Sequence, residues 1–278
     1  MAATQPHTGT LYVVATPIGN LEDITFRAVR VLREVDLIAC EDTRQTRKLL
    51  DHFGIGKPAV SYHEHNEQVR SSELLAELLS GKNIALVSDA GTPLIADPGY
   101  RLVAKAREAG IFVVPLPGPC AVVAAMSASG LPTDSFLFYG FLPAKSRQRR
   151  KALEQFQALD MPLVFYEAPH RMLEMLEDIA AVLGTRPVVL ARELTKIHEE
   201  FLRGTAAELL ATLRERGSIR GELTVMVGRG EALPQEDTTV EEAVEELIRN
   251  GVPRMDALKQ VARRRGLSKR EVYKQTQQ

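Results

Sequence analysis

The sequence is poor in several residue types, and each shortage excludes a class of protein. It has no tryptophan and only two cysteines, Cys40 and Cys120, which lie far apart and outside any metal-binding spacing. We therefore expect buried, reduced thiols rather than a disulfide framework or a zinc site. No apolar run approaches the ~18 residues that a membrane-spanning helix needs. Residues 1–9 lack the apolar segment of a signal peptide, so we expect a cytoplasmic protein.

Charge of one sign is not in excess either. The chain of 278 residues has 35 Lys and Arg against 36 Asp and Glu, a net charge of −1. Any binding to nucleic acid must therefore use a local basic patch rather than the field of the whole molecule. The length fits about two domains, and the composition is that of an ordinary globular protein.

The most informative stretch is residues 83–99. It starts with an apolar run, Ile84 to Val87, which is typical of a strand buried on both faces, and then becomes rich in Gly, Pro and Asp. Ligands of open α/β sheets bind where such loops leave the carboxyl ends of strands. Asp89 can accept hydrogen bonds from a ligand, and Gly91 permits close backbone approach. The alternative is an ordinary strand-to-helix connection in which Asp89 caps a turn.

Apolar strands alternate with amphipathic helices throughout the first half, which predicts a mainly parallel sheet covered on both faces. In the second half, two strands between 188 and 203 are too close for a helical crossover, so we predict an antiparallel pair in a mixed sheet. The predicted strands are 10–15, 36–40, 59–62, 84–87, 111–115, 135–139, 163–166, 188–193, 197–203 and 222–228. The predicted helices are 25–34, 43–53, 66–80, one ending near 109, 121–129, 147–158, 170–183, 206–216, 240–250, 254–265 and 268–277.

The predicted fold class is α/β, in three parts. We expect an N-terminal α/β domain at 10–117, a C-terminal α/β domain at 118–232 and a helical, helix-turn-helix-like tail at 233–278. Basic residues gather at 145–151, and a second group in the tail comprises 263–265 with 269–270. A charge run is usually a solvated helix face, but two basic patches on a near-neutral protein favour a polyanionic partner.

Several polar motifs follow the predicted strands. Thr16-Pro-Ile-Gly-Asn20 is neither a dinucleotide fingerprint nor a phosphate-binding loop. Glu41-Asp-Thr-Arg44 offers a carboxylate to take a proton and an arginine to bind phosphate, or else Asp42 caps a helix. His63-Glu-His-Asn-Glu67 lacks metal-site spacing, so we interpret it as a polar rim with Asn66 as helix cap, and a histidine base stays open.

Nine motifs occur in an order that closely resembles the ribosomal RNA small subunit methyltransferase I family. This family is a branch of the S-adenosylmethionine-dependent tetrapyrrole methylase-like superfamily. The resemblance covers residues 10–230, and the helical tail also fits. The motifs are Thr16-Pro-Ile-Gly-Asn20, Glu41-Asp-Thr-Arg44, Tyr62-His-Glu-His-Asn66, Ser88-Asp-Ala-Gly-Thr-Pro93, Asp97-Pro-Gly99, Pro117-Gly-Pro119, Gly140-Phe-Leu-Pro143, Tyr166-Glu-Ala-Pro-His-Arg171 and Arg192-Glu-Leu-Thr-Lys196.

The resemblance implies two tetrapyrrole-methylase-type domains with S-adenosylmethionine in the cleft between them, in a homodimer. It implies 2′-O-methylation of a cytidine ribose in the decoding region of 16S rRNA, on the small ribosomal subunit. The wider superfamily has a glycine-rich first loop and Gly-Asp-Pro after the fourth strand, which Pro-Ile-Gly and Ser-Asp-Ala replace here. The implied cofactor contacts are Pro17, Ile18, Asp89, Thr92, Pro117, Gly118, Pro119 and Tyr166.

Methyl transfer from a sulfonium needs alignment and a base for the ribose hydroxyl, but no metal. We predict the base among Asp42, Glu64 and Glu193, with Lys196 as electrostatic helper. Contacts to the RNA substrate are predicted at Arg44, Arg47, Asn66, Arg147, Arg149, Arg150 and Arg171.

Two alternatives remain. The first is a small-molecule methylase of the tetrapyrrole type, which would leave the basic tail unexplained and for which this chain offers few aromatic side chains. The second is a nucleic-acid-binding regulator with an α/β ligand sensor, which the polar clusters at the strand ends disfavour.

Overall fold

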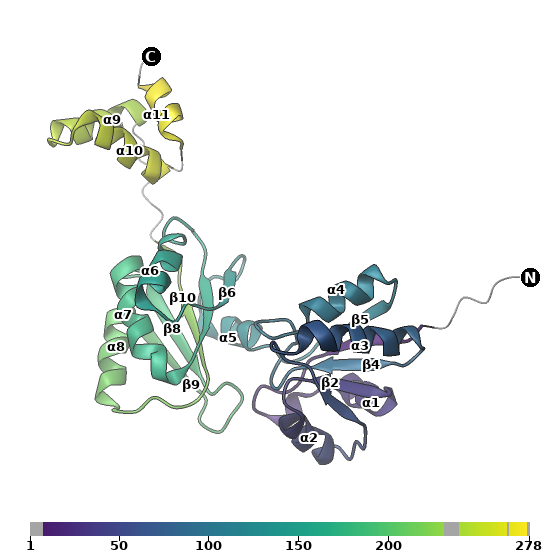
Figure 1. Cartoon of the computed structure of the whole chain (residues 1–278). Coiled ribbons are helices and arrows are strands. Elements are labelled where there is room, and N and C mark those ends of the chain that lie inside the picture. Colours follow the sequence, from purple (N-terminus) through teal and green to yellow (C-terminus); the bar gives the residue numbers. More distant parts are fainter. Residues whose placement is uncertain (1–7, 231–238, 266, 277–278) are drawn as a thin grey trace, which may run out of the picture.

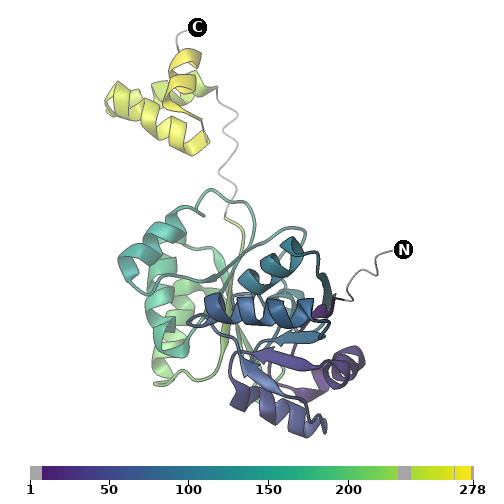
Figure 2. The ribbon, with the colours of Figure 1, turned by 45° about the vertical axis from the view of Figure 1, so that its right-hand side comes forward.

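The computed structural model describes residues 8–230, 239–265 and 267–276. Two α/β domains lie side by side, and a group of three helices at the C-terminal end stands apart from them in both views (Figures 1 and 2). Within these described residues, no helix has the length and apolar character needed to cross a bilayer.

The first sheet is entirely parallel, as predicted, with the strand order β3-β2-β4-β1-β5. All four residues of the central strand β4 are buried, because helices cover both faces of the sheet. Ile84 and Leu86 face one apolar core, whereas Ala85 and Val87 face another. The strands are β1 (Thr10–Val14), β2 (Leu37–Cys40), β3 (Ala59–Ser61), β4 (Ile84–Val87) and β5 (Phe112–Leu116).

Helices α1 and α2 supply one of these cores, and α3 and α4 supply the other. Helix α1 begins at its cap Thr25, whose side chain accepts from the Ala28 backbone N–H, and it turns Ala28, Val31 and Leu32 inward. The helices are η1 (Leu21–Asp23), α1 (Phe26–Glu34), α2 (Thr43–His52), α3 (Glu67–Leu79) and α4 (Tyr100–Glu108).

The second sheet is mixed, with the strand order β6-β7-β10-β8-β9. Strands β6 and β7 are parallel, and the other neighbours are antiparallel, including the predicted β8–β9 pair. Strand β6 begins and ends two residues later than predicted, and its pairing continues past a bulge before Gly140 as far as Phe141. The strands are β6 (Leu137–Phe141), β7 (Leu163–Glu167), β8 (Pro187–Arg192), β9 (Glu200–Thr205) and β10 (Leu223–Val227).

Helices α6, α7 and α8 cover one face of the second sheet, and α5 covers the other. Helix α5 joins the two domains in sequence, and its Val122, Ala125 and Met126 share a core with Ile18 of the first domain and Leu194 of the second. The helices are α5 (Ala121–Ser129), α6 (Ser146–Glu154), η2 (Pro169–Arg171), α7 (Met172–Leu183) and α8 (Ala206–Glu215).

The tail has an apolar core of its own, formed by α9 (Val240–Arg249), α10 (Arg254–Arg265) and α11 (Lys269–Gln275). Thr239 and Ser268 each form a capping box at the start of a helix, as expected for Ser268. Of the second predicted basic patch, Lys269 and Arg270 are exposed, and the side chains of 263–265 lie outside the described residues.

Candidate active site

A cavity of about 380 Å³ lies between the two domains, at the carboxyl ends of β1, β2 and β4. This volume is within the range of small-molecule and cofactor sites. Both domains contribute to its wall, which makes the domain junction the place where a ligand would contact both sheets. It is lined by Ile18, Glu41, Asp89, Ala90, Gly91, Thr92, Ile95, Asp97, Cys120, Ala121, Phe141, Tyr166, Glu167, Ala168, Pro169, Ala191, Leu194, Glu222, Leu223 and Thr224.

Four of the eight predicted cofactor contacts line this cavity: Ile18, Asp89, Thr92 and Tyr166. The other four, Pro17, Pro117, Gly118 and Pro119, directly precede the lining residues Ile18 and Cys120 in the chain and are not among the described lining residues. Thr92 ties these loops together, because its Oγ1 donates to the carbonyl oxygen of Pro119 at 2.9 Å. Gly118 is needed for the same packing, since a Cβ there would lie 2.8 Å from the Cβ of Ala15.

The charged residues in the described lining of the cavity are all acidic. Glu41, Asp89, Asp97, Glu167 and Glu222 all line the cavity, and no lysine, arginine or histidine is among its described lining residues. No group of three or more His, Cys, Asp or Glu side chains in the described parts of the chain is arranged to hold a metal ion. The cavity therefore suits an organic cation, whose positive charge the carboxylates would stabilise.

Three of these carboxyl groups crowd the end of the first sheet. Burial raises the pKa of Glu41, and the negative charges of Asp97, Asp89 and Asp42 raise it further. Burial likewise raises the pKa of Asp89 and of Asp97, against the opposing effect of one hydrogen bond to each. Glu41 makes no hydrogen bond within the described residues, which leaves its oxygens free to take a proton.

Two consecutive carboxylates follow β2, Glu41 and the predicted candidate base Asp42. Asp42 is the N-cap of α2, where its carboxylate accepts hydrogen bonds from the backbone N–H and from the guanidinium of Arg44, both at 2.8 Å. The side-chain and backbone hydrogen bonds from Arg44 lower the pKa of Asp42 to about 2. Asp42 is not among the described lining residues, whereas its neighbour Glu41 is. The turn from strand to helix thus points consecutive carboxylates in different directions.

Two of the remaining predicted catalytic residues, Glu193 and Lys196, contact the lining residue Glu222. Glu193 accepts from Lys196 Nζ at 2.8 Å and from the Glu222 backbone N–H at 3.0 Å, and these bonds lower its pKa despite partial burial. Burial alone would lower the pKa of Lys196, but its contacts with Glu193 and Glu222 raise it. Glu64 is an exposed residue between β3 and α3. The described wall of the cavity includes Glu222, and it includes none of these three.

The predicted RNA contacts separate into exposed and structural arginines. Arg44 and Arg47 are exposed on α2, and Arg147 is exposed on α6. Asn66 is half-buried and closes its own turn: it accepts from the His63 backbone N–H and donates to the Ser61 carbonyl.

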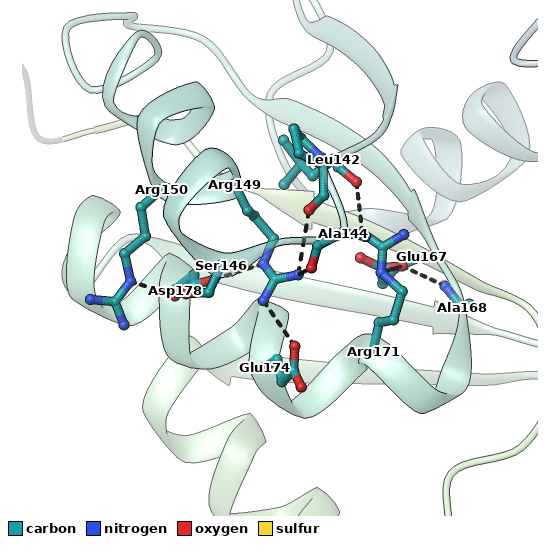
Figure 3. Close-up of polar contacts among 11 residues, drawn as sticks. Leu142, Ala144, Ser146, Arg149, Arg150, Glu167, Ala168, Arg171, Glu174 and Asp178 are labelled. Carbon is teal, nitrogen blue, oxygen red and sulfur yellow. Dashed lines mark hydrogen bonds and ion pairs between the residues drawn. The ribbon is translucent and has the colours of Figure 1, made fainter.

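Arg149 is fully buried in an ion-pair network that leaves no surface for RNA (Figure 3). Its Nε donates to Asp178 at 2.7 Å, and its Nη1 donates to the Ala144 carbonyl at 3.0 Å. Arg150 also pairs with Asp178 but is half-exposed, so it keeps surface for a phosphate. Arg171 donates to the Leu142 carbonyl and pairs with Glu167 behind the cavity wall. Arg149 therefore has a structural role, whereas the RNA contact at Arg171, whose side chain is 20% exposed, stays a prediction.

Comparison with known proteins agrees with this architecture. The family model for Tetrapyrrole (Corrin/Porphyrin) Methylases matches residues 10–210. A solved structure of diphthine synthase has a TM-score of 0.65 at 15% identity and covers 79% of this chain and 90% of its own. A uroporphyrin-III C-methyl transferase from Thermus thermophilus, solved with S-adenyl homocysteine, has a TM-score of 0.56 at 18% identity, with 79% and 97% covered. The fold and the cavity thus define a methylase of the tetrapyrrole type.

Closer relatives identify the branch. The chain is 52% identical over 271 residues to ribosomal RNA small subunit methyltransferase I of Halalkalibacterium halodurans, covering 95% of this chain and 93% of the relative. It is also 52% identical over 268 residues to the protein of the same name from Escherichia coli O157:H7, with 96% and 94% covered. The chain belongs to the tetrapyrrole methylase family and, within it, to ribosomal RNA small subunit methyltransferase I, as its motifs predicted.

Proposed function

We propose that this chain transfers a methyl group from S-adenosylmethionine to the 2′-hydroxyl of a cytidine ribose in the decoding region of 16S rRNA. The coarser part, a methyltransferase that uses S-adenosylmethionine, follows from family membership. The names of the relatives support small-subunit ribosomal RNA as the substrate. The finer part, the cytidine and its 2′-oxygen, rests on what the resemblance of the motifs implies.

The observation that carries the proposal is the acidic cavity between the domains, whose described lining residues include no Lys, Arg or His. When bound, S-adenosylmethionine supplies an activated methyl on a positively charged sulfur. The residues present fit such a group, because Asp89 and Asp97 provide negative charge while Ile18, Ala121 and Leu194 provide apolar contact. Gly91, at a φ of +89°, lets the wall approach a ligand without a side chain in the way.

Within this site we propose Glu41 as the group that takes the proton from the ribose hydroxyl. Its carboxylate lines the cavity, makes no hydrogen bond within the described chain, and has a raised pKa because it is buried among other carboxylates. A raised pKa makes a carboxylate a stronger base, which a weakly acidic hydroxyl requires. Asp42, Glu64 and Glu193 remain the competing candidates, with Lys196, which pairs with the lining residue Glu222, as electrostatic helper.

One assay tests the proposed function. Methyl-labelled S-adenosylmethionine is offered with free 16S rRNA, with assembled small subunits and with a porphyrinogen, and the labelled RNA is hydrolysed with alkali. A 2′-O-methylated ribose protects its own phosphodiester bond, so the label is expected in an alkali-resistant dinucleotide that contains cytidine. Label only in the porphyrinogen, or only on an RNA base, would reject the proposal.

We also propose that the protein is a homodimer and acts in the cytoplasm on the small ribosomal subunit. The resemblance to the family supports both statements. Analytical ultracentrifugation of the purified chain tests the dimer, which a mass near the 30.7 kDa of one chain would contradict.

A further inference from the structure

Phe141 is an exposed aromatic side chain at the mouth of the cavity. It lines the cavity, yet 53% of its surface stays accessible to solvent. Single exposed apolar residues are common on protein surfaces and need no explanation by themselves. What sets Phe141 apart is that the backbone of β6 is distorted to place it there.

A bulge in β6 decides which face Phe141 occupies. Phe138 pairs with Val164 of β7, but after the bulge Gly140 pairs with Phe165 and Phe141 pairs with Tyr166. In a regular strand, alternation would place Phe141 on the opposite face from Phe138. The extra residue shifts Phe141 by one position, so that it shares the cavity face with Phe138 and Tyr166. Bulges of this kind are over-represented next to active sites, where they re-aim a side chain.

Gly140 makes the bulge feasible at the domain junction. Its φ of +82° is in the left-handed region that favours glycine. A Cβ there would lie 3.6 Å from Ala96 of the first domain, in the loop that also carries the cavity residues Ile95 and Asp97. The bulge thus presents Phe141 at the rim where the two domains meet.

Among the described residues, Tyr166 is the aromatic neighbour of the Phe141 ring. Its centroid is 5.7 Å from that of Tyr166 with the planes tilted by 59°, and Tyr166 packs edge-on against Phe138 at 5.0 Å. Tyr166 is held in place by the strand pairing of β7, so it fixes the ring of Phe141 from behind. The solvent-accessible part of the ring is available to another flat group.

The segment that follows Phe141 in the chain is positively charged. Lys145, the N-cap of α6, is exposed, and so are Arg147, Arg150 and Lys151 within the helix, which covers the other face of the sheet. Arg150 shares Asp178 with the buried Arg149, and the other three make no ion pair within the described residues. An exposed aromatic ring that is followed in the chain by exposed cations matches a single-stranded nucleic acid, which presents bases and phosphates together.

We propose that Phe141 is a stacking platform for a nucleobase of the RNA substrate at the mouth of the methyl-transfer cavity. The inference rests on the proposed function, and it names a residue that selects an unpaired, unstacked nucleotide. Stacking on an aromatic ring is tolerant of base identity, so Phe141 would hold a nucleotide in place without reading its sequence.

The test replaces the ring while keeping its apolar bulk. Phe141→Leu is compared with Phe141→Tyr, which retains the ring, and with Tyr139→Leu as matched control. Tyr139 lies on the same strand and is 44% exposed, but its ring packs on Phe156 and Phe165 on the opposite face. For each variant, KM and kcat for small subunits are measured at saturating S-adenosylmethionine, and the Kd for S-adenosylhomocysteine is measured by calorimetry.

Phe141→Leu is expected to raise the RNA KM by roughly 5- to 100-fold, the range that corresponds to one stacked base, with the S-adenosylhomocysteine Kd within about twofold of wild type. Phe141→Tyr and Tyr139→Leu are expected to stay near wild type in both. A weakened S-adenosylhomocysteine Kd with an unchanged RNA KM would assign the ring to the cofactor and overturn the proposal, as would equal effects of Phe141→Leu and Tyr139→Leu. If wild-type protein binds S-adenosylhomocysteine but labels no RNA, the proposed function itself fails.

Discussion

Thr16 and Gly91 exchange a pair of backbone hydrogen bonds just beyond the ends of β1 and β4. The Thr16 N–H donates to the Gly91 carbonyl at 2.9 Å, and the Gly91 N–H donates to the Thr16 carbonyl at 3.0 Å. The Thr16 hydroxyl adds a bond to the Ser88 carbonyl at 3.0 Å. This isolated bridge joins the two loops that carry Ile18 and Asp89, so it sets the shape of one wall of the cavity.

The bridge predicts a specific effect of Gly91→Ala. Gly91 has a φ of +89°, which costs an alanine roughly 1–2 kcal/mol, and the new Cβ would lie 3.4 Å from Ile18 inside the cavity lining. We expect a loss of about that size in the free energy of unfolding, together with weaker binding of S-adenosylhomocysteine. Urea denaturation and calorimetry measure the two effects.

Gly110→Ala is the matched control for backbone strain. Gly110 also has a positive φ, +73°, but a Cβ there meets nothing within 4 Å, and the residue lies at the far end of α4. The same loss of stability is expected, with an unchanged Kd for S-adenosylhomocysteine. Equal Kd values for all three proteins would mean that Gly91 does not shape the ligand site.

Asp178 should be essential to the second domain. It is the buried partner of the fully buried Arg149, so Asp178→Asn leaves a cation without its main counter-charge. Breaking a buried pair in this way typically costs about 3–5 kcal/mol. Glu177→Gln removes only the exposed pair with Arg214 and should cost less than about 1 kcal/mol. Chemical denaturation of both variants gives the comparison, and similar costs would show that the network is not stabilising.

The stability provided by Asp178 should also depend on pH. Burial opposes ionisation, but hydrogen bonds from Arg150, Ser146 and Arg149 outweigh it and lower the pKa of Asp178. The folded pKa is then below the unfolded value of about 3.9, so the stabilisation is complete above that pH and is lost as the pH falls through the folded pKa. The difference in stability between wild type and Asp178→Asn should be constant near neutral pH and shrink in acid.

The proposed base gives the activity a characteristic pH dependence. Burial and neighbouring carboxylates raise the pKa of Glu41. As the pH is lowered, the rate of methyl transfer should therefore begin to fall at a higher pH than it would for a glutamate of ordinary pKa. Glu41→Gln should lower kcat by about 10²- to 10⁴-fold and abolish this acid limb, with little change in S-adenosylhomocysteine affinity. Parallel assays of Asp42→Asn, Glu64→Gln and Glu193→Gln discriminate the candidates. If the acid limb of the pH–rate profile survives in Glu41→Gln and is lost in one of the other variants, the residue replaced in that variant is the base.

The helical tail is expected to contribute to RNA binding and not to cofactor binding. Helices α9, α10 and α11 share a core that includes Val244, Leu258 and Val272, so the removal of residues 234–278 should leave the two α/β domains folded. We expect weaker binding to small subunits, with a shallower dependence on salt concentration, and unchanged affinity for S-adenosylhomocysteine. Binding titrations at several salt concentrations measure this. If the affinity for small subunits depends on salt concentration in the same way after the deletion, the tail does not contribute to RNA binding.

Much of the fold was predictable, because the polar residues that end each strand are visible in the sequence. The parallel sheet follows from the alternation of strands and helices, and the antiparallel β8–β9 pair follows from the short connection between its strands. The position of the cavity was predictable for the same reason, since the loops after β1 and β4 carry Ile18 and Asp89.

The direction of individual side chains was not predictable. Glu41 and Asp42 are adjacent carboxylates, and only the turn into α2 decides that Glu41 lines the cavity while Asp42 caps the helix. Arg149 lies in a basic run with exposed neighbours, but the inward face of α6 buries it on Asp178. Phe141 escaped notice because a one-residue bulge, which no periodicity reveals, changes its face. Asp97 and Glu222 were missed as lining residues, although Asp97 belongs to one of the nine motifs.

The position of α5 between the two sheets has a consequence for how the protein moves. Because Val122 and Met126 pack in one core with Ile18 and Leu194, the segment that joins the domains is part of their shared interior rather than a flexible linker. Swinging the domains apart would expose that core to water, at a cost that grows with the apolar area uncovered. Ligand exchange is therefore expected to use small motions of the rim loops, and the two domains should melt together as a single cooperative unit.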